Sequence, residues 1–283
     1  MTDRFARQRL LFGDHGQEKL RATRVAVVGA GGLGAFAVLE LAYLGVGKIV
    51  IVDGDRLEVS NRNREVGAWE SHQEGTPKVE LLRELVAMID SSIEVVAVPE
   101  SFQSPEGRKA LEQVDVVMGC MDRDGARLEL NEFCCELGLP LIDMASDTFI
   151  DRNGVLFGGR VCVVTPETGC LSCQRVLDQR EIRLDLASDE QRADVKAIYG
   201  VSQDALTRSG PSVISINGVV SSLGVIELMA LITGIREPFA QLDYHGHEAF
   251  IRKVVDRENN CYYCALRPKP LTTPTTSSED KLP

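Results

Sequence analysis

The sequence predicts an α/β protein with a mostly parallel sheet, flanked by helices and extended by antiparallel strands. Three observations predict this fold class. From Arg24 onward, short runs rich in valine and isoleucine alternate with helical patterns, as in βαβ units. A glycine-rich loop joins the first of these runs to the first helix that follows it. Later, residues 154–166 look like a hairpin, which would add antiparallel strands to the sheet.

The expected elements follow one another in a regular order. Residues 1–23 are polar to amphipathic and are expected to be partly helical. Strands are expected over 24–28, 48–53, 93–98, 114–120 and 140–146, with helices over 35–45, roughly 78–90, 125–138 and 211–234, and a further helix between 98 and 114. Residues 174–210 are expected to be irregular or partly helical, because ten of the nineteen residues from 178 to 196 are charged. Residues 269–283 have the composition of a disordered tail.

The composition narrows the class of protein. A chain of 283 residues with 44% hydrophobic and 26% charged residues can bury a sizeable core. The net charge of −11 argues against broad nucleic-acid binding, which needs a basic face. No stretch approaches about 18 uninterrupted apolar residues and the N-terminus is polar, so we expect neither a membrane span nor a signal peptide. We therefore expect a cytoplasmic protein whose eight cysteines stay reduced and serve metal binding or chemistry.

The loop VVGAGGLG predicts a Rossmann-like nucleotide site. Gly29 permits a tight turn, Gly31 lets the backbone approach a phosphate, and Gly34 lets the helix pack on the strand. The helix N-terminus presents unpaired N–H groups to the phosphates. Asp53 follows Gly29 by 24 residues, at the end of the second strand, where a carboxylate can bind the ribose hydroxyls. Because NAD and ATP share that ribose, Asp53 does not choose between them.

Cationic residues after the second strand favour a triphosphate. Arg62, Arg64 and Lys78 fall within reach of phosphates at the mouth of the sheet. A nicotinamide enzyme does not need these cations, whereas the β- and γ-phosphates and the departing pyrophosphate of ATP must be neutralised. A solvated basic turn is the alternative. Asp122 comes just after a later strand, where a carboxylate could hold Mg²⁺ on the phosphates.

Two CxxC pairs predict a metal site. Cys170 and Cys173 are separated from Cys261 and Cys264 by 87 residues. Four thiolates with paired two-residue spacings suit a closed tetrahedral zinc site, and such a site would be structural. A chance set of buried free cysteines and a redox pair are the alternatives. His245 and His247 lie at i,i+2 on an expected strand without a visible third ligand, which favours a surface strand over a second metal site.

Taken together, the motifs resemble a known family. They are RFARQ, VVGAGGLG, IVDGD, SNRNRE, GTPK, CMDRDGAR, the paired CxxC motifs and the late apolar helix. The chain resembles the ThiF/MoeB/HesA adenylyltransferases, bacterial relatives of the ubiquitin-activating enzymes, over roughly residues 4–268. The resemblance implies one adenylation domain over 1–268, with a crossover or lid segment at about 174–210 and a disordered tail over 269–283.

The family's reaction would use ATP and Mg²⁺ to convert the C-terminal glycine carboxylate of a small ubiquitin-like protein into an acyl-adenylate, releasing pyrophosphate. The resemblance also implies roles for individual residues, and it implies a homodimer. Gly31 and Gly32 would line the nucleotide, and Asp53 would bind ribose. The phosphates would be contacted by Asn61, Arg64 and Lys78. Asp122 would be the magnesium-binding and catalytic carboxylate, and Arg7 would reach into the active site of the other protomer.

The sequence departs from the family in two places. The family usually has Arg-Gln where this chain has Arg64-Glu65, and a carboxylate near phosphates should weaken binding unless it points away or meets a cation. Members that carry the activated protein as a thioester or acyl persulfide use a cysteine in the loop after the first CxxC. No cysteine lies between Cys173 and Cys261. The remaining cysteines, Cys120, Cys134, Cys135 and Cys162, fall in helix or strand patterns typical of core residues. We therefore expect adenylation without a covalent enzyme intermediate.

Other functions stay open at the sequence level. The partner could be a sulfur carrier that receives sulfur from a separate donor, a protein of a conjugation pathway with its own thiol enzyme, or a short peptide. A tRNA-bound substrate is disfavoured by the acidic chain, and neither nucleic acid nor membrane is expected as a partner. An NAD-dependent oxidoreductase would leave Arg64, Lys78 and the CxxC pairs unexplained. A catalytically silent scaffold has Glu65 as its supporting hint.

Overall fold

The computed structural model describes residues 3–151, 154–187, 212–255, 257–258 and 261–268. The predicted tail over 269–283 and most of the predicted lid, residues 188–210, lie outside the described residues. The described start of the lid segment includes the short helix α6 (Gln179–Asp185), so this part is partly helical as expected.

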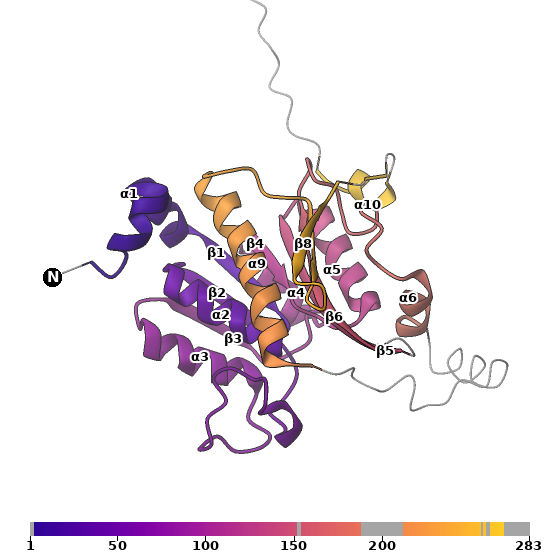
Figure 1. The fold of residues 1–283 in the computed structure, drawn as a ribbon. Coiled ribbons are helices and arrows are strands. Elements are labelled where there is room, and N and C mark those ends of the chain that lie inside the picture. Colours follow the sequence, from indigo (N-terminus) through magenta and orange to yellow (C-terminus); the bar gives the residue numbers. More distant parts are fainter. Residues whose placement is uncertain (1–2, 152–153, 188–211, 256, 259–260, 269–283) are drawn as a thin grey trace, which may run out of the picture.

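An eight-stranded sheet runs through the middle of the molecule in the order β3-β2-β1-β4-β5-β6-β7-β8 (Figure 1). Its strands are β1 (Arg24–Val28), β2 (Lys48–Val52), β3 (Glu94–Val98), β4 (Val116–Gly119), β5 (Leu141–Asp151), β6 (Gly154–Val164), β7 (Gln241–His245) and β8 (Phe250–Val254). The strands from β3 to β5 in this order pair in parallel, and β6, β7 and β8 are added antiparallel. The predicted fold class is confirmed.

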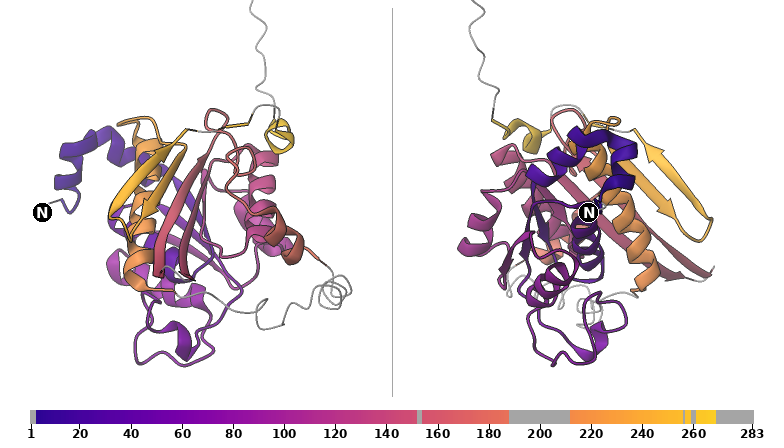
Figure 2. Two further views of the ribbon diagram at one scale, coloured as in Figure 1. Left: turned by 45° about the vertical axis from the view of Figure 1, so that its right-hand side comes forward. Right: turned by 90° about the vertical axis from the view of Figure 1, so that its left-hand side faces the viewer.

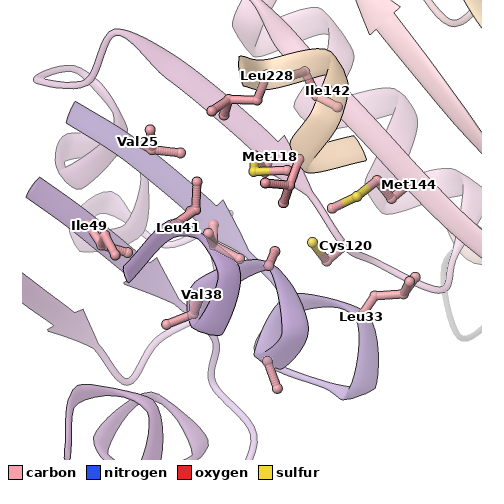
Figure 3. Close-up of a cluster of buried hydrophobic side chains, with 14 of the residues drawn as sticks. Val25, Leu33, Val38, Leu41, Ile49, Met118, Cys120, Ile142, Met144 and Leu228 are labelled. Carbon is pink, nitrogen blue, oxygen red and sulfur yellow. The ribbon is translucent and has the colours of Figure 1, made fainter. Parts of the chain in front are cut away.

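Helices cover both faces of the sheet because its central strands are apolar on both sides. Side chains of β1 alternate: Val25 and Val27 join one buried cluster, whereas Ala26 and Val28 join the other. The first face is covered by α1 (Ala6–Ala22), α2 (Gly32–Leu44), α3 (Lys78–Ile89) and α9 (Ile214–Thr233), and the second by α4 (Pro105–Leu111), α5 (Asp124–Leu137), α6 and α10 (Tyr262–Ala265) (Figure 2). Figure 3 shows part of the first cluster, between α2, the sheet and α9.

Helix α9 is apolar because it is a core helix. The helix is long and apolar enough to cross a membrane, but half of its most apolar stretch of residues is buried inside the molecule. It packs on α2, β5 and β6. Close packing is visible at Gly224, where a Cβ atom would lie 2.1 Å from the sulfur of Met144.

The predicted hairpin over 154–166 is wrong in its detail. These residues form the single strand β6, and the antiparallel partner is β5, which runs to Asp151 rather than ending at 146. Gly158 and Gly159 remain inside the strand and do not form a turn. A Cβ atom on Gly158 would lie 2.0 Å from the Tyr244 carbonyl oxygen, and one on Gly159 would lie 2.4 Å from Val220. The two glycines therefore let β6 pack closely against β7 and α9.

The sheet order places a topological switch point at the carboxyl ends of the parallel strands. β1 pairs with β2 on one side and β4 on the other, so the connections from β1 and β4 leave in opposite directions. Ligands of such sheets bind at this switch point. The loops after β1, β2 and β4 carry the predicted glycine loop, Asp53 and Asp122, so the topology brings these segments to one edge of the sheet.

Candidate functional site

The glycine loop has the geometry that the sequence predicts. Gly29 has a φ of +96°, and its N–H donates to the Val52 carbonyl over 2.9 Å. A Cβ atom on Gly34 would lie 1.8 Å from the Gly29 carbonyl oxygen, so α2 packs directly on the turn. At Gly31, by contrast, a Cβ atom would meet nothing within 4 Å. No described side chain caps α2, whose first N–H groups are thus free to bind an anion.

Asp53 ties the end of β2 to this loop. Its carboxylate accepts hydrogen bonds from the Ala30 N–H over 2.5 Å and from the Asp55 N–H over 2.6 Å. Burial raises the pKa of Asp53, although both backbone hydrogen bonds and the charge of Lys78 act in the other direction. Each carboxylate oxygen can accept a further hydrogen bond. The fixed side chain therefore suits a ribose diol next to the glycine loop.

The three predicted cations differ in what they are free to do. Lys78 is the first residue of α3 and is buried, and its Nζ lies 2.9 Å from an Asp55 oxygen. Burial acts against its charge, but the hydrogen bond to Asp55 and the nearby carboxylates raise its pKa. Arg64 uses only Nη1, which donates to the Ser60 carbonyl over 2.8 Å and to the Asn63 side chain over 3.1 Å, so its other guanidinium nitrogens have no partner among the described residues. Arg62, however, donates to the carbonyls of Trp69 and His72, so it holds the loop together and is not available for phosphates.

The turn around Asn61 positions Arg64 beside the start of α2. The Asn61 carbonyl accepts the N–H groups of both Arg64 and Glu65, each over 3.0 Å. A Cβ atom on Gly32 would lie 3.5 Å from the Arg64 carbonyl oxygen. The turn thus lies against the glycine loop.

Two aspartates after β4 have opposite environments. Asp122 is exposed, and no described residue binds its carboxylate. Asp124 is buried, and its oxygens accept from the Arg127 guanidinium over 2.6 Å and from the Asp178 N–H over 2.7 Å. Arg127 also forms a buried ion pair with Asp143. Asp122 is therefore the carboxylate at this edge that is free to bind a metal–phosphate group.

Arg7 does not join the other predicted residues within the chain. It is exposed on α1, next to Gln8, whose side chain donates to the Leu44 carbonyl at the C-terminal end of α2. The glycine loop lies at the other end of this 13-residue helix, about 20 Å away at 1.5 Å per residue. Figure 1 shows α1 at the opposite end of the molecule from the loop that precedes α3. Its role across a dimer stays a prediction.

Sequence reasoning missed Asn217. This residue lies in the first turn of α9 and is 2% exposed. Its Nδ2 atom is 2.2 Å from the place that a Cβ atom on Gly32 would occupy, and its Oδ1 accepts from the Ser146 hydroxyl over 2.8 Å. Asn217 therefore joins α9 and β5 to the glycine loop. An amide within a mostly apolar helix was the available signal.

The four cysteines of the CxxC pairs form one cluster. Cys170 and Cys173 follow β6, Cys261 precedes α10 and Cys264 lies in it. Their sulfur atoms lie within 4.8 Å of one another, with 3.4 Å between Cys170 and Cys261 and 3.7 Å between Cys173 and Cys264. In a tetrahedral site with Zn–S bonds of about 2.3 Å, sulfurs are about 3.8 Å apart. The cluster therefore fits a zinc ion.

The other cysteines are core residues, as predicted. Cys120, Cys134, Cys135 and Cys162 are buried, and none of the eight cysteines forms a disulfide. Burial raises the pKa of Cys134 to about 12, and it also raises the pKa of Cys120 and Cys162. Such thiols are poor nucleophiles because the thiolate is the reactive form.

The prediction for the histidines needs correction. β7 ends at His245, and His247 lies in the following turn rather than on the strand. A third group is present, since Glu248 has an oxygen 3.8 Å from His245 Nδ1 and 3.7 Å from His247 Nε2. The i,i+2 spacing could not show this turn.

Comparison with known proteins agrees with this arrangement. The model of the ThiF family matches residues 5–266. The Escherichia coli sulfur carrier protein ThiS adenylyltransferase is 29% identical, over 92% of this chain and 94% of its own length. The Thermus thermophilus sulfur carrier protein adenylyltransferase is 30% identical, over 94% and 92%. The crystal structure of E. coli MccB with ATP shares the fold, with a TM-score of 0.72 at 20% identity, over 93% of this chain and 75% of that chain.

The matched family covers nearly the whole chain, including every predicted site residue. The curated relatives are named as adenylyltransferases. The chain belongs to the ThiF family and is an adenylyltransferase of that class.

Proposed function

We propose that this protein uses ATP to adenylate the C-terminal glycine carboxylate of a small ubiquitin-like protein. The observation that carries the proposal is the nearness of Asp53, Lys78 and Arg64 to the free N-terminus of α2, and Asp122 follows β4, the neighbour of β1 in the sheet. These side chains provide one acceptor for a ribose, two cations for phosphates and one unpartnered carboxylate. Sulfur carrier proteins are the substrates in the names of two relatives, which supports a partner of this kind.

Each residue has a role in binding or charge stabilisation. Asp53 binds the ribose hydroxyls, and the N–H groups at the start of α2 bind phosphate oxygens. Gly31 and Gly32 let the nucleotide approach the backbone, and Asn217 supports this loop from α9. Arg64 and Lys78 neutralise the β- and γ-phosphates, with Asn61 beside them.

The reaction needs positioning more than acid–base chemistry. A carboxylate oxygen of the partner attacks the α-phosphorus of ATP, a new P–O bond forms, and the bond to the β-phosphate oxygen breaks. Pyrophosphate leaves with the electron pair, so no proton has to move. Lys78 and Arg64 stabilise the charge that develops on the leaving group. The Asp122 carboxylate would hold Mg²⁺, which when bound neutralises phosphate charge.

The acyl group stays on AMP until a downstream protein takes it. This follows from the buried free thiols and from the lack of a cysteine between Cys173 and Cys261 in the sequence. A separate sulfur donor or thiol transfer enzyme would then act on the adenylate. Residues 1–268 would form the adenylation domain of a cytoplasmic protein.

Zinc in the cysteine cluster would be structural. With four thiolate ligands no coordination position remains for a substrate, and the cluster connects the segment after β6 to the C-terminal helix α10. Its contribution would be to hold these two distant segments together.

A second copy would complete the site. An apolar groove of about 360 Å³ lies between α1, α2 and α9, lined by residues that include Gln8, Tyr43, Ile226 and Met229. It is adjacent to Arg7, which cannot reach the glycine loop of its own chain. A homodimer formed over this groove would cover the exposed Tyr43 and Ile226 and supply Arg7 to the other copy.

The test is ATP–pyrophosphate exchange with Mg²⁺ and candidate ubiquitin-like proteins ending in Gly-Gly from the same genome. Exchange that depends on one of them would establish the reaction and identify the partner. ATP binding without exchange for any candidate would favour a peptide substrate or a silent scaffold. No ATP binding would overturn the nucleotide site.

A further inference from the structure

Glu65 is a buried carboxylate beside the proposed phosphate site. It follows Arg64 in the turn after Asn61, and it is 6% exposed. Its Oε1 atom is fully buried and has no hydrogen-bond partner among the described residues. A buried ionised carboxylate without hydrogen bonds is unfavourable, so the surroundings favour a proton on this group.

The charged groups that face Glu65 do not compensate for its burial. They are Lys78 at the start of α3, Asp53 and Asp55 after β2, and Arg64 beside it. Lys78 is held by Asp55 over 2.9 Å, and the Arg64 guanidinium donates to the Ser60 carbonyl and to the Asn63 side chain. With Glu65 ionised, the cluster would contain three carboxylates against two cations that are already engaged. Burial raises the pKa of Glu65 to about 7, so both protonation states are populated near neutral pH.

A bound triphosphate would shift the protonation equilibrium of Glu65 toward the neutral carboxyl. It brings several negative charges toward Lys78 and Arg64, and any turn of Lys78 toward phosphate removes it from the carboxylates. Both effects disfavour the ionised form of Glu65. A proton on Glu65 also turns the carboxyl into an O–H donor. Because Oε1 has no partner among the described residues, this O–H group could donate to an oxygen acceptor such as a phosphate.

We propose that Glu65 takes up a proton when ATP binds, so that the affinity for ATP falls as the pH rises above neutrality. This inference rests on the proposed nucleotide site and goes beyond it, because it makes the site sensitive to pH through one residue. The neutral Glu65 side chain has the size and shape of glutamine, the residue that the family usually carries at this position.

Calorimetric titration of the full chain with ATP at pH 8, in two buffers of different ionisation enthalpy, measures the protons taken up on binding. We expect the wild type to take up close to one proton more than Glu65→Gln, which fixes the neutral form. Between pH 7 and pH 9 the Kd of the wild type should rise by up to about tenfold per pH unit, whereas that of Glu65→Gln should stay constant once the titration of ATP itself is subtracted. Glu58→Gln removes an exposed carboxylate of the same loop and should behave like the wild type.

Three outcomes would overturn the inference. Equal proton uptake by the wild type and Glu65→Gln would assign the proton elsewhere and leave ATP binding intact. A Kd whose pH dependence between pH 7 and pH 9 is the same for the wild type and Glu65→Gln would reject it as well. Absence of ATP binding in all three proteins would reject the nucleotide site and this inference together.

Discussion

At the scale of single residues, the two aspartates after β4 are expected to have different roles: Asp122 in the reaction and Asp124 in stabilising the fold. Asp122 is exposed and free, whereas Asp124 holds Arg127 and the N–H of Asp178. We expect Asp122→Ala to keep the fold and lower pyrophosphate exchange at least about 100-fold, because charge stabilisation is lost. Asp124→Ala should lower the free energy of unfolding by about 1.5–3 kcal/mol through its lost charged hydrogen bonds. Exchange assays and urea denaturation of both variants check this, and normal turnover by Asp122→Ala would remove it from the mechanism.

Glu65 should also affect stability in a pH-dependent way. Its pKa is raised from the ordinary value of 4.5 to about 7, so between these values the folded protein keeps a proton that the unfolded chain has lost. The free energy of unfolding therefore falls as the pH rises through this window, by about 3 kcal/mol, and is level above it. Glu65→Gln should abolish this part of the pH dependence, measured by denaturation at pH 5 and pH 8. The same pH dependence in both proteins would show that Glu65 titrates normally.

At the scale of elements, the start of α2 combines a packing position with a binding position. A Cβ atom on Gly34 would lie 1.8 Å from the Gly29 carbonyl oxygen, whereas one on Gly31 would face open space. Gly34→Ala should therefore lower the free energy of unfolding by about 1–3 kcal/mol. Gly31→Ala should fold with normal stability and bind ATP weakly, since its methyl group occupies the space for phosphate. Thermal melts and ATP titrations distinguish the two, and normal ATP affinity in Gly31→Ala would place the phosphates elsewhere.

At the scale of the whole molecule, the cysteine cluster joins segments that are far apart in sequence. We expect Cys173→Ser to release zinc and to lower the Tm by about 5 °C or more, since metal binding is coupled to folding. Cys134→Ser removes a buried thiol outside the cluster and should keep the metal. Metal analysis and melting curves test this, and a wild type purified without zinc would contradict it.

The dimer is the second prediction at this scale. Arg7 should act in the site of the other copy, so Arg7→Ala and Asp122→Ala should each be inactive alone. Mixed and allowed to exchange subunits, they should recover about a quarter of the wild-type activity, because half of the dimers carry one intact site. No recovery despite subunit exchange would place both residues in one chain's site, and normal activity of Arg7→Ala alone would exclude Arg7.

The sequence by itself determined the alternation of strands and helices between residues 24 and 146, the glycine loop, the position of Asp53 after the second strand and the paired cysteines. These are local signals, since they depend on period, turn chemistry and fixed spacing along the chain. It also predicted the burial of the four remaining cysteines, because they fall in apolar patterns.

The tertiary structure decided which of several similar residues is available. Arg62 and Arg64 are two residues apart, yet Arg62 binds loop carbonyls through both terminal nitrogens, whereas Arg64 uses only Nη1. Asp124 is buried beside Arg127, Asn217 reaches the glycine loop from α9, and β6 is one strand rather than a hairpin. Each of these outcomes depends on contacts between segments distant in sequence, and hydrogen-bond partners and burial across such distances leave no periodic pattern along the chain.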